Sequence, residues 1–303
     1  MSAPALVVGE TLIDVVHAEG DQPTEKVGGS ATNTAVALRR LGRDVRMATS
    51  FGRDERGAAI TRLLDSEGIA LAVDPHVTPR TSTSTATIGA DGAASYTFDL
   101  DWRLGPLLPG AAPALVHVAS LGAVVPPGSD TVLALVRELA GRTTVSYDLN
   151  LRPAMVDYQP DLVGTVEQLV RISHIAKASN EDLAMLYPGL DWPEAARALL
   201  AHGPSLVAVT LGANGCAWVD AGGTTTVPAH PTTVVDTIGA GDTFGAALLD
   251  GLWRHGLLAP ARAGRLDVDE ATRVGILTRA AHAAAICVAR RGANPPTLAE
   301  LDG

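Results

Sequence analysis

Short β-branched runs alternate along most of this chain with longer runs whose apolar residues have helical spacing. Six apolar runs have the length and composition of buried strands, at 5–9, 44–49, 114–119, 143–148, 172–178 and 206–211. Apolar residues at intervals of three and four predict helices over 33–41, 54–64, 131–139, 193–201 and 272–289. Strands that alternate with helices favour an α/β fold with a mainly parallel central sheet flanked by helices.

The segment 80–104 breaks this alternation. Its Thr, Ile, Tyr and Phe residues alternate with small or polar ones around an ADGA turn at 90–93, which is typical of a β-hairpin. Together with 11–17, this segment is expected to form a small β-sheet that projects from the main one. The small sheet is interpreted either as a lid that closes over a ligand or as an edge hairpin without a ligand role.

Composition favours one compact domain over 1–303. Of the 303 residues 47% are hydrophobic and 18% charged, and neither an internal repeat nor a low-complexity linker divides them. The net charge of -10 disfavours nucleic acid and anionic membrane surfaces as partners, so we expect a small molecule. The sequence has no apolar run of the ~18 residues that a membrane span needs, and MSAPALVVGE lacks the pattern of a signal peptide. Cys216 and Cys287 match no zinc or CxxC spacing, and we expect reduced thiols in a cytoplasmic protein.

The segment VVDTIGAGDTFGAALLDGL, residues 234–252, carries the clearest candidate chemistry. Gly239 and Gly241 allow successive N–H groups to face one point, and a helix that starts there adds the positive end of its dipole. This arrangement suits an anion. The next residue is Asp242. A carboxylate at this position is repelled by a bound phosphate, which disfavours it unless it has a role as a base. The segment therefore indicates phosphoryl transfer to a hydroxyl group, and a simple N-capping aspartate is the alternative.

Several motifs together resemble the ribokinase-type (PfkB) family of sugar kinases. They are GETLID at 9–14, GGSATN at 28–33, TLGANG at 210–215, DTIGAGD at 236–242 and RRGANPP at 290–296. The resemblance implies a ribokinase-like fold and an ATP-dependent kinase that transfers the γ-phosphoryl group to a primary hydroxyl of a small sugar. DLNLRP at 148–153 and GANPPT at 292–297 are most similar to fructokinase-like members. Fructose is thus the first candidate substrate and ribose the second, while a nucleoside or a keto-deoxy sugar acid ranks lower.

The resemblance also implies roles for individual residues. Asp242 is the expected catalytic base, with the N–H groups of Gly239, Ala240 and Gly241 as the anion hole. The expected sugar-binding residues are Asp14, Gly28, Gly29, Asn33 and Arg152. The expected nucleotide-side residues are Ser179, Asp182, Thr210, Gly212 and Gly215. A monovalent cation, K⁺, is expected at Asp236, Ile238, Arg290 and Gly292.

Ser179 and Asp182 stand where the family commonly has Asn-x-x-Glu, a motif linked to Mg²⁺ and phosphate positioning. The shorter aspartate is expected to act through water. Local explanations stay open for other positions: Asp14 as a turn residue, Ser30 and Asn33 as a helix cap, and Arg152 as a partner of Asp148.

Aromatic and histidine residues add less to the function. Tyr96 and Trp102 either stack on a sugar ring or fill the core of the hairpin. The spacing of the histidines matches no metal site, so we predict structural or exposed roles for His17, His117, His174 and His282.

Two other functions remain open. One is a non-catalytic regulator that binds a sugar or nucleotide on the same fold. The other is an NAD-dependent Rossmann enzyme, which GETLID disfavours because it is no GxGxxG motif. The resemblance further implies a homodimer through the lid strands.

Overall fold

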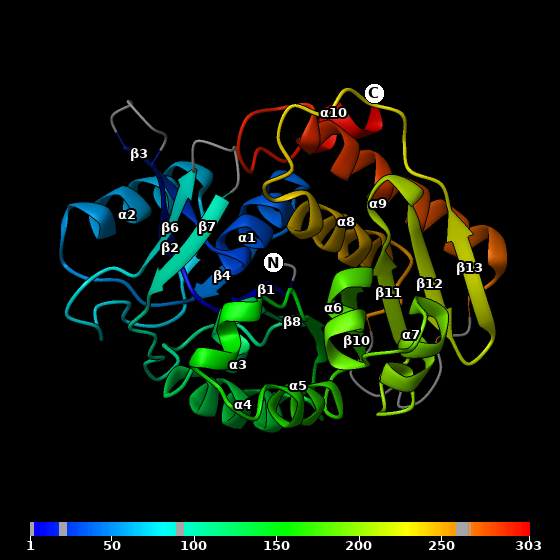
Figure 1. Ribbon diagram of the computed structural model, residues 1–303, viewed down its shortest axis with the longest axis horizontal. Coiled ribbons are helices and arrows are strands. Elements are labelled where there is room, and N and C mark those ends of the chain that lie inside the picture. Colours follow the sequence, from blue (N-terminus) through cyan, green and yellow to red (C-terminus); the bar gives the residue numbers. More distant parts are fainter. Residues whose placement is uncertain (1–2, 18–22, 89–93, 259–265, 267) are drawn as a thin grey trace.

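The computed structural model describes residues 3–17, 23–88, 94–258, 266 and 268–303. Its main sheet contains, in chain order, β1 Ala5–Val8, β4 Val45–Ala48, β5 Ala70–Leu71, β8 Leu115–Ala119, β9 Thr144–Asp148, β10 Ile175–Ser179, β11 Leu206–Thr210, β12 Cys216–Asp220 and β13 Gly223–Val227. In space the order is β13-β12-β11-β10-β9-β8-β1-β4-β5 (Figure 1). All pairs from β11 to β5 are parallel, and β12 and β13 add an antiparallel hairpin at one edge.

Helices cover both faces of this sheet (Figure 1). One face carries α1 Ser30–Arg40, α2 Glu55–Glu67, α8 Ala240–Arg254, α9 Glu270–Val288 and α10 Leu298–Asp302. The other carries α3 Ser120–Val124, α4 Gly128–Leu139, α5 Leu162–Val170, α6 Asn180–Leu186 and α7 Trp192–Leu200. Two short 3₁₀ turns, η1 Pro153–Asp157 and η2 Gly212–Asn214, follow β9 and β11. In the described part of the chain, no helix combines the length and the apolar character that crossing a membrane requires.

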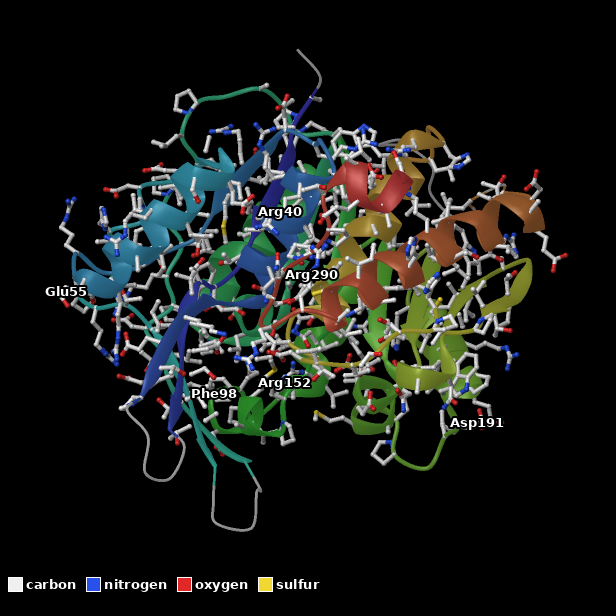
Figure 2. The ribbon with its side chains drawn as sticks, turned by 90° about the horizontal axis from the view of Figure 1, so that it is seen from above. Arg40, Glu55, Phe98, Arg152, Asp191 and Arg290 are labelled. Atoms are coloured by element: carbon white, nitrogen blue, oxygen red, sulfur yellow. The ribbon has the colours of Figure 1, made fainter. Side chains whose placement is uncertain are left out.

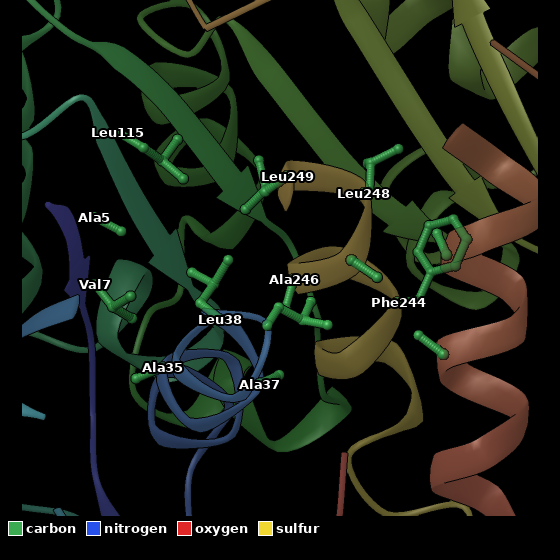
Figure 3. Close-up of a cluster of buried hydrophobic side chains, with 14 of the residues drawn as sticks. Ala5, Val7, Ala35, Ala37, Leu38, Leu115, Phe244, Ala246, Leu248 and Leu249 are labelled. Carbon is green, nitrogen blue, oxygen red and sulfur yellow. The ribbon is translucent and has the colours of Figure 1, made fainter. Parts of the chain in front are cut away.

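The two faces explain why the strands are apolar along their whole length. Ala5 and Val7 of β1 belong to the core beneath α1 and α8, whereas Leu6 and Val8 belong to the core on the opposite face. Figure 3 shows the first of these cores, where Phe244 and neighbouring side chains of α8 lie in the same cluster as Leu38 of α1. The packing of α8 against α1 brings together segments about 200 residues apart in the chain.

A second, four-stranded sheet has the order β3-β2-β6-β7. Its strands are β2 Leu12–His17, β3 Thr24–Gly28, β6 Thr83–Ile88 and β7 Ala94–Asp99. Figure 1 shows this sheet beside α2 and apart from the main sheet. The prediction of a small sheet from 11–17 and 80–104 is confirmed, although the predicted turn at 90–93 lies outside the described residues.

The six predicted strands and five predicted helices are confirmed, with ends that differ by three residues or fewer. The strands β3, β5, β12 and β13 were not predicted. Trp102 lies in the core of the main domain, where its indole N–H donates to the Gly122 carbonyl at 3.0 Å. Trp102 therefore contributes to packing, and the side chain of Tyr96 lies outside the described residues.

The strand order reverses at β1. The chain runs from β1 to β4 and β5 on one side, and from β8 through β11 on the other. In open α/β sheets, ligands bind at such a reversal, beyond the carboxyl ends of the strands. Two non-glycine residues with positive φ lie there: Ser120 directly after β8 (φ 52°) and Asn150 two residues after β9 (φ 39°). Such conformations cluster at functional sites, so this edge of the sheet is the expected place for one.

Candidate active site

The start of α8 lies at this edge, and its geometry depends on glycine. Gly239 is the N-cap residue, with a left-handed conformation at φ 75° and ψ 2°. A Cβ atom on Gly239 would lie 2.6 Å from the Cβ of Ala293, so a larger residue fits neither the backbone nor the space. Because α8 is 15 residues long, its first turn offers unpaired N–H groups and the positive end of a helix dipole.

The three residues predicted as an anion hole lie in this turn, but their N–H groups differ in hydrogen bonding. The N–H of Ala240 donates to the Thr237 carbonyl at 3.3 Å. For the N–H groups of Gly239 and Gly241, the described residues supply no acceptor. Of the three N–H groups predicted to form the cradle, those of the two glycines thus have no acceptor in the described chain, as an anion site requires.

Asp242 lies in the first turn of α8 with only 7% of its surface exposed. Ser30 Oγ donates to its Oδ1 at 2.6 Å, and Asn33 Nδ2 donates to its Oδ2 at 2.8 Å. Both donors lie in the first turn of α1, where the N-cap residue is Gly29 and no side chain caps the helix. The interpretation of Ser30 and Asn33 as a helix cap is thus wrong, and so is that of Asp242 as an N-cap.

Three other predicted sugar-binding residues, Asp14, Gly28 and Gly29, lie next to these donors. The carboxylate of Asp14, on β2, occupies the space beside Gly28, where an added Cβ would come within 2.0 Å of Oδ2. Gly29 has φ 100° and passes so close to the Glu10 carbonyl that a Cβ would lie 2.6 Å from it. Burial raises the pKa of Asp14 to about 6, opposed by a hydrogen bond from Ser84 and reinforced by the charge of Asp242.

Glu10 was not predicted as part of the site. Its side chain is 3% exposed, and its Oε2 accepts the Gly122 N–H at 2.7 Å. Burial raises the pKa of Glu10 to about 8, opposed by the backbone N–H groups of Gly122, of Glu10 itself and of Ser30. Glu10 thus lies beside the backbone of Ser30, whose hydroxyl donates to Asp242. The only signal in the sequence is its position directly after Gly9 at the end of the first strand.

A cleft of about 670 Å³ opens on the other side of the α8 N-terminus. Thr210, Gly212 and Gly215 line it, as do Ala240 and Gly241 of the cradle. The structure therefore brings these three predicted nucleotide-side residues to the predicted anion hole.

One wall of the cleft was missed. It consists of small residues on one side of α9, namely Ala281, Ala284, Ala285 and Val288. Their spacing of three and four was visible in the sequence, but there it indicated only a covering helix.

Ser179 and Asp182 form a capping box at the start of α6. Ser179 Oγ accepts the Asp182 N–H at 3.0 Å, and Asp182 Oδ2 accepts the Ser179 N–H at 2.7 Å. The second oxygen of Asp182 accepts the Leu151 N–H at 2.7 Å. Both oxygens of this buried carboxylate are thus used by backbone groups, and the acidic residue that lines the cleft is Glu181.

The residues predicted to hold a monovalent cation meet at two neighbouring loops. Asp236 Oδ1 accepts the Ile238 N–H at 3.0 Å, and its Oδ2 accepts the Gly292 N–H at 2.7 Å. Arg290 lies two residues before Gly292, and its guanidinium pairs with Glu300 at 2.7 Å. The side chain of Asp236 therefore ties together the two segments on which the prediction depends.

Arg152 does not pair with Asp148, so that interpretation is wrong. Its guanidinium donates to the Leu151 carbonyl at 2.7 Å, and the residue, which is labelled in Figure 2, is exposed. Asp148 instead pairs with Lys177, whose Nζ lies 3.0 and 2.8 Å from the two carboxylate oxygens. The sequence gives no signal for Lys177, because no local pattern distinguishes a buried lysine from an exposed one.

The histidines have the structural surroundings expected of them. Burial lowers the pKa of His117 to about 3, and His174 accepts the Val145 N–H at 2.9 Å. His282 stacks on His230, with ring centroids 4.4 Å apart. The side chain of His17 is not among those described. Among the described residues, no group of three or more His, Cys, Asp or Glu side chains is arranged to hold a metal ion.

The sequence matches known proteins along nearly its whole length. A family model described as pfkB family carbohydrate kinase matches residues 3–300. A fructokinase of Rhizobium leguminosarum bv. trifolii is 31% identical over 281 residues, which cover 89% of this chain and 86% of that protein. The aminoimidazole riboside kinase of Salmonella typhimurium is 28% identical over 272 residues, which cover 84% of each.

The fold matches solved structures equally well. The crystal structure of the fructokinase from Vibrio cholerae O395, in its fructose, ADP and calcium ion bound form, superposes with a TM-score of 0.81. The sequences are 25% identical, and the match covers 99% of this chain and 98% of that one. The predicted architecture of a mainly parallel sheet with a separate small sheet is thus that of known sugar kinases.

Proposed function

The chain belongs to the pfkB family of carbohydrate kinases, and on this premise we propose that it transfers the γ-phosphoryl group of ATP to a primary hydroxyl of fructose, with Asp242 as general base. The resemblance described from the sequence is confirmed at the level of the family. The protein is a sugar kinase, a phosphotransferase with an alcohol group as acceptor.

One observation carries the proposal of the catalytic base. The carboxylate of Asp242 lies between the sugar-side residues and the cleft, bonded to Asn33 on one side and one residue after Gly241, which lines the cleft. A sugar hydroxyl held beside Asn33 is then within reach of a proton acceptor, and a phosphoryl group at the cradle faces it. Negative charge that develops on this group is stabilised by the dipole of α8. The N–H groups of Gly239 and Gly241, which have no acceptor in the described chain, stabilise it as well.

Fructose is favoured over the other candidates by similarity. The Rhizobium leguminosarum relative is a fructokinase, and the Vibrio cholerae structure contains fructose. A nucleoside, ranked below ribose from the sequence, becomes the second candidate, because the aminoimidazole riboside kinase is nearly as similar. A keto-deoxy sugar acid needs cationic contacts to its carboxylate. The segments proposed for the sugar side supply little for this besides Arg103 and Arg152, and Arg103 pairs with Asp101.

We assign Mg²⁺ to the phosphates of the nucleotide and to water more than to protein ligands. Both oxygens of Asp182 already accept a backbone N–H, and Asp182 does not line the cleft, so we propose that Glu181, which does, takes the role proposed for Asp182. Mg²⁺ suits this arrangement because it keeps several waters and binds through few carboxylates. Bound there, the ion would neutralise phosphate charge. K⁺ is proposed at the loops joined by Asp236, where carbonyl oxygens suit a hard cation.

The remaining proposals concern organisation. We propose one domain over 1–303, with the sheet of β3, β2, β6 and β7 as a lid over the sugar, because Asp14 on β2 lies at the sugar side. A homodimer through these lid strands and a cytoplasmic location complete the proposal. Both cysteines are free and buried, as expected in a reducing compartment.

ADP release in a coupled assay tests the activity. The panel is fructose, ribose, glucose, 2-keto-3-deoxygluconate and adenosine with Mg-ATP, each with and without K⁺. Release with fructose above the others supports the proposal, and a preference for adenosine moves the assignment to a nucleoside kinase. If no acceptor gives release while ATP still binds, the non-catalytic regulator replaces the enzyme.

The variant D242N tests the base. It keeps the size of the side chain and removes its ability to accept a proton, so we expect kcat to fall by about 10²- to 10⁴-fold with little change in ATP affinity. Turnover close to the wild-type rate would exclude Asp242 as the base.

A further inference from the structure

Lys177 lies behind the anion cradle. Its side chain is 6% exposed and extends from β10 along the first two turns of α8. Nζ lies 3.0 Å from the point that a Cβ of Gly241 would occupy, and Cδ lies 3.8 Å from the corresponding point of Gly245. These glycines are one helical turn apart, so their missing side chains leave the channel that the lysine fills.

The lysine is held in a fixed direction by Asp148. The two residues are direct neighbours on the parallel strands β10 and β9 and therefore point to the same face of the sheet. Within the described residues, Nζ donates both of its hydrogen bonds to Asp148, whose side chain is 1% exposed. The ammonium lies at Gly241 and the carboxylate near Gly245, so the positive end of the pair faces the cradle.

Stability alone accounts poorly for this arrangement. Removing two charges from water is costly, and buried ion pairs are often no more stable than apolar residues of similar size. The position is also unfavourable for a cation, because the positive end of the α8 dipole lies beside it. Burial lowers the pKa of Lys177, but Asp148, Asp182 and Asp242 more than offset this and raise it overall, so the lysine is charged.

We propose that the Lys177–Asp148 pair is a built-in positive pole that stabilises the charge of the phosphoryl group as it is transferred at the cradle. This inference rests on the kinase function proposed above. Lys177 is not among the residues that line the cleft, so it acts through the backbone of Gly241 and is a positioning residue. A fixed charge next to a preorganised anion site lowers the energy of the transition state without reorganisation during the reaction.

The double variant K177M/D148N separates this role from a structural one. K177M alone leaves a buried carboxylate without its partner and is expected to lower Tm, whereas the double variant removes both charges and restores it. We expect the double variant to keep its KM for ATP but to lose kcat by about 10- to 100-fold, less than the loss of a direct donor to the reacting group. If kcat recovers together with Tm, the pair is structural and the proposal is wrong.

A second buried pair serves as the matched control. Arg273 of α9 and Asp220 at the end of β12 lie 2.9 Å apart, with side chains 12% and 2% exposed. R273M/D220N is expected to change Tm without changing kcat. An equal loss of kcat in this control would mean that any buried pair affects turnover, which would also overturn the proposal.

A binding measurement keeps the inference independent of the sugar. The affinities for Mg-ADP and for Mg-ADP with aluminium fluoride, a mimic of the transferred group, are measured by calorimetry for wild type and K177M/D148N. We expect the double variant to weaken the fluoroaluminate complex about 10-fold or more and Mg-ADP much less. Equal weakening of both complexes refutes the role of Lys177. Failure of the kinase proposal would appear differently, as no ADP release by the wild type with any acceptor of the panel.

Discussion

The hydrogen bond from Ser30 to Asp242 makes a sharp prediction about the active site. Ser30 Oγ lies 2.6 Å from Oδ1 of a carboxylate that is 7% exposed, and Asn33 holds the other oxygen. The substitution S30A removes the first donor and leaves the second. Because Ser30 is already inside α1 and caps nothing, the change does not remove a helix cap.

The size of the effect follows from the charge and the burial of Asp242. A hydrogen bond to a charged group contributes about 1.5–3 kcal/mol, and little solvent is available to replace it here. We therefore expect the free energy of unfolding to fall by about 2 kcal/mol. The carboxylate loses one of the two contacts that orient it, so kcat should fall about 10-fold, since a tenfold change in rate corresponds to about 1.4 kcal/mol.

Thr34, on the same helix, provides the control. Its hydroxyl is buried and finds no hydrogen-bond partner in the described structure, so T34V should leave stability unchanged or raise it by about 1 kcal/mol. Urea denaturation gives the stability of S30A and T34V, and coupled ADP release gives kcat and KM. Wild-type stability and turnover in S30A would refute the assigned bond, and so would equal losses in both variants.

Three further predictions concern backbone geometry and pH. G239A should lower the free energy of unfolding by about 1–3 kcal/mol and turnover by about 10²-fold, because φ is 75° and the Cβ of Ala293 lies 2.6 Å from the added Cβ. Thermal denaturation measures the first effect and ADP release the second. KM for the sugar should rise as pH falls through about 6, where Asp14 gains a proton and accepts fewer hydrogen bonds, and D14N should flatten this profile. The pKa of Glu10 rises from 4.5 to about 8 on folding, so its contribution to stability is complete below pH 4.5 and is lost as pH rises to about 8. Urea titrations at pH 5 and 8 should show this decline, about 4 kcal/mol at most, in wild type and not in E10Q.

Much of the fold was predictable because the main strands are buried on both faces. Runs such as ALVV at 5–8 and LVAVT at 206–210 are continuous apolar segments, and helical spacing separates them. The strand β3 was missed for the opposite reason. Its sequence TEKVG begins with three exposed polar residues, so neither an apolar run nor a strict alternation marks it. Pairing with β2, and not its own composition, makes it a strand.

The candidate site was predictable only where the chain itself carries the geometry. DTIGAGD contains both the glycines and the carboxylate, and the structure places them in one helix start. Glu10 and Lys177 were missed because their importance lies in partners far along the chain. Glu10 binds the N–H of Gly122, 112 residues away, and Lys177 on β10 lies against Gly241 at the start of α8. A single sequence gives no physical signal for such contacts.

Two similar patterns show how the backbone decides between a cap and a site contact. SATN at 30–33 and SNED at 179–182 both begin with serine and end with a polar residue at a helix start. Ser179 has extended backbone angles, φ -87° and ψ 166°, so it occupies the N-cap position and its hydroxyl bonds within α6.

At the first pattern, Gly29 takes the N-cap position with φ 100°, a conformation that the nearby carbonyl of Glu10 restricts to glycine. Ser30 is thereby displaced into the helix, where its hydroxyl bonds across to Asp242 on α8 instead of capping α1. The glycine before the serine therefore does more than allow a close approach to a ligand. It converts a capping residue into a donor for the proposed catalytic base, which is why S30A is expected to affect turnover and S179A chiefly the stability of α6.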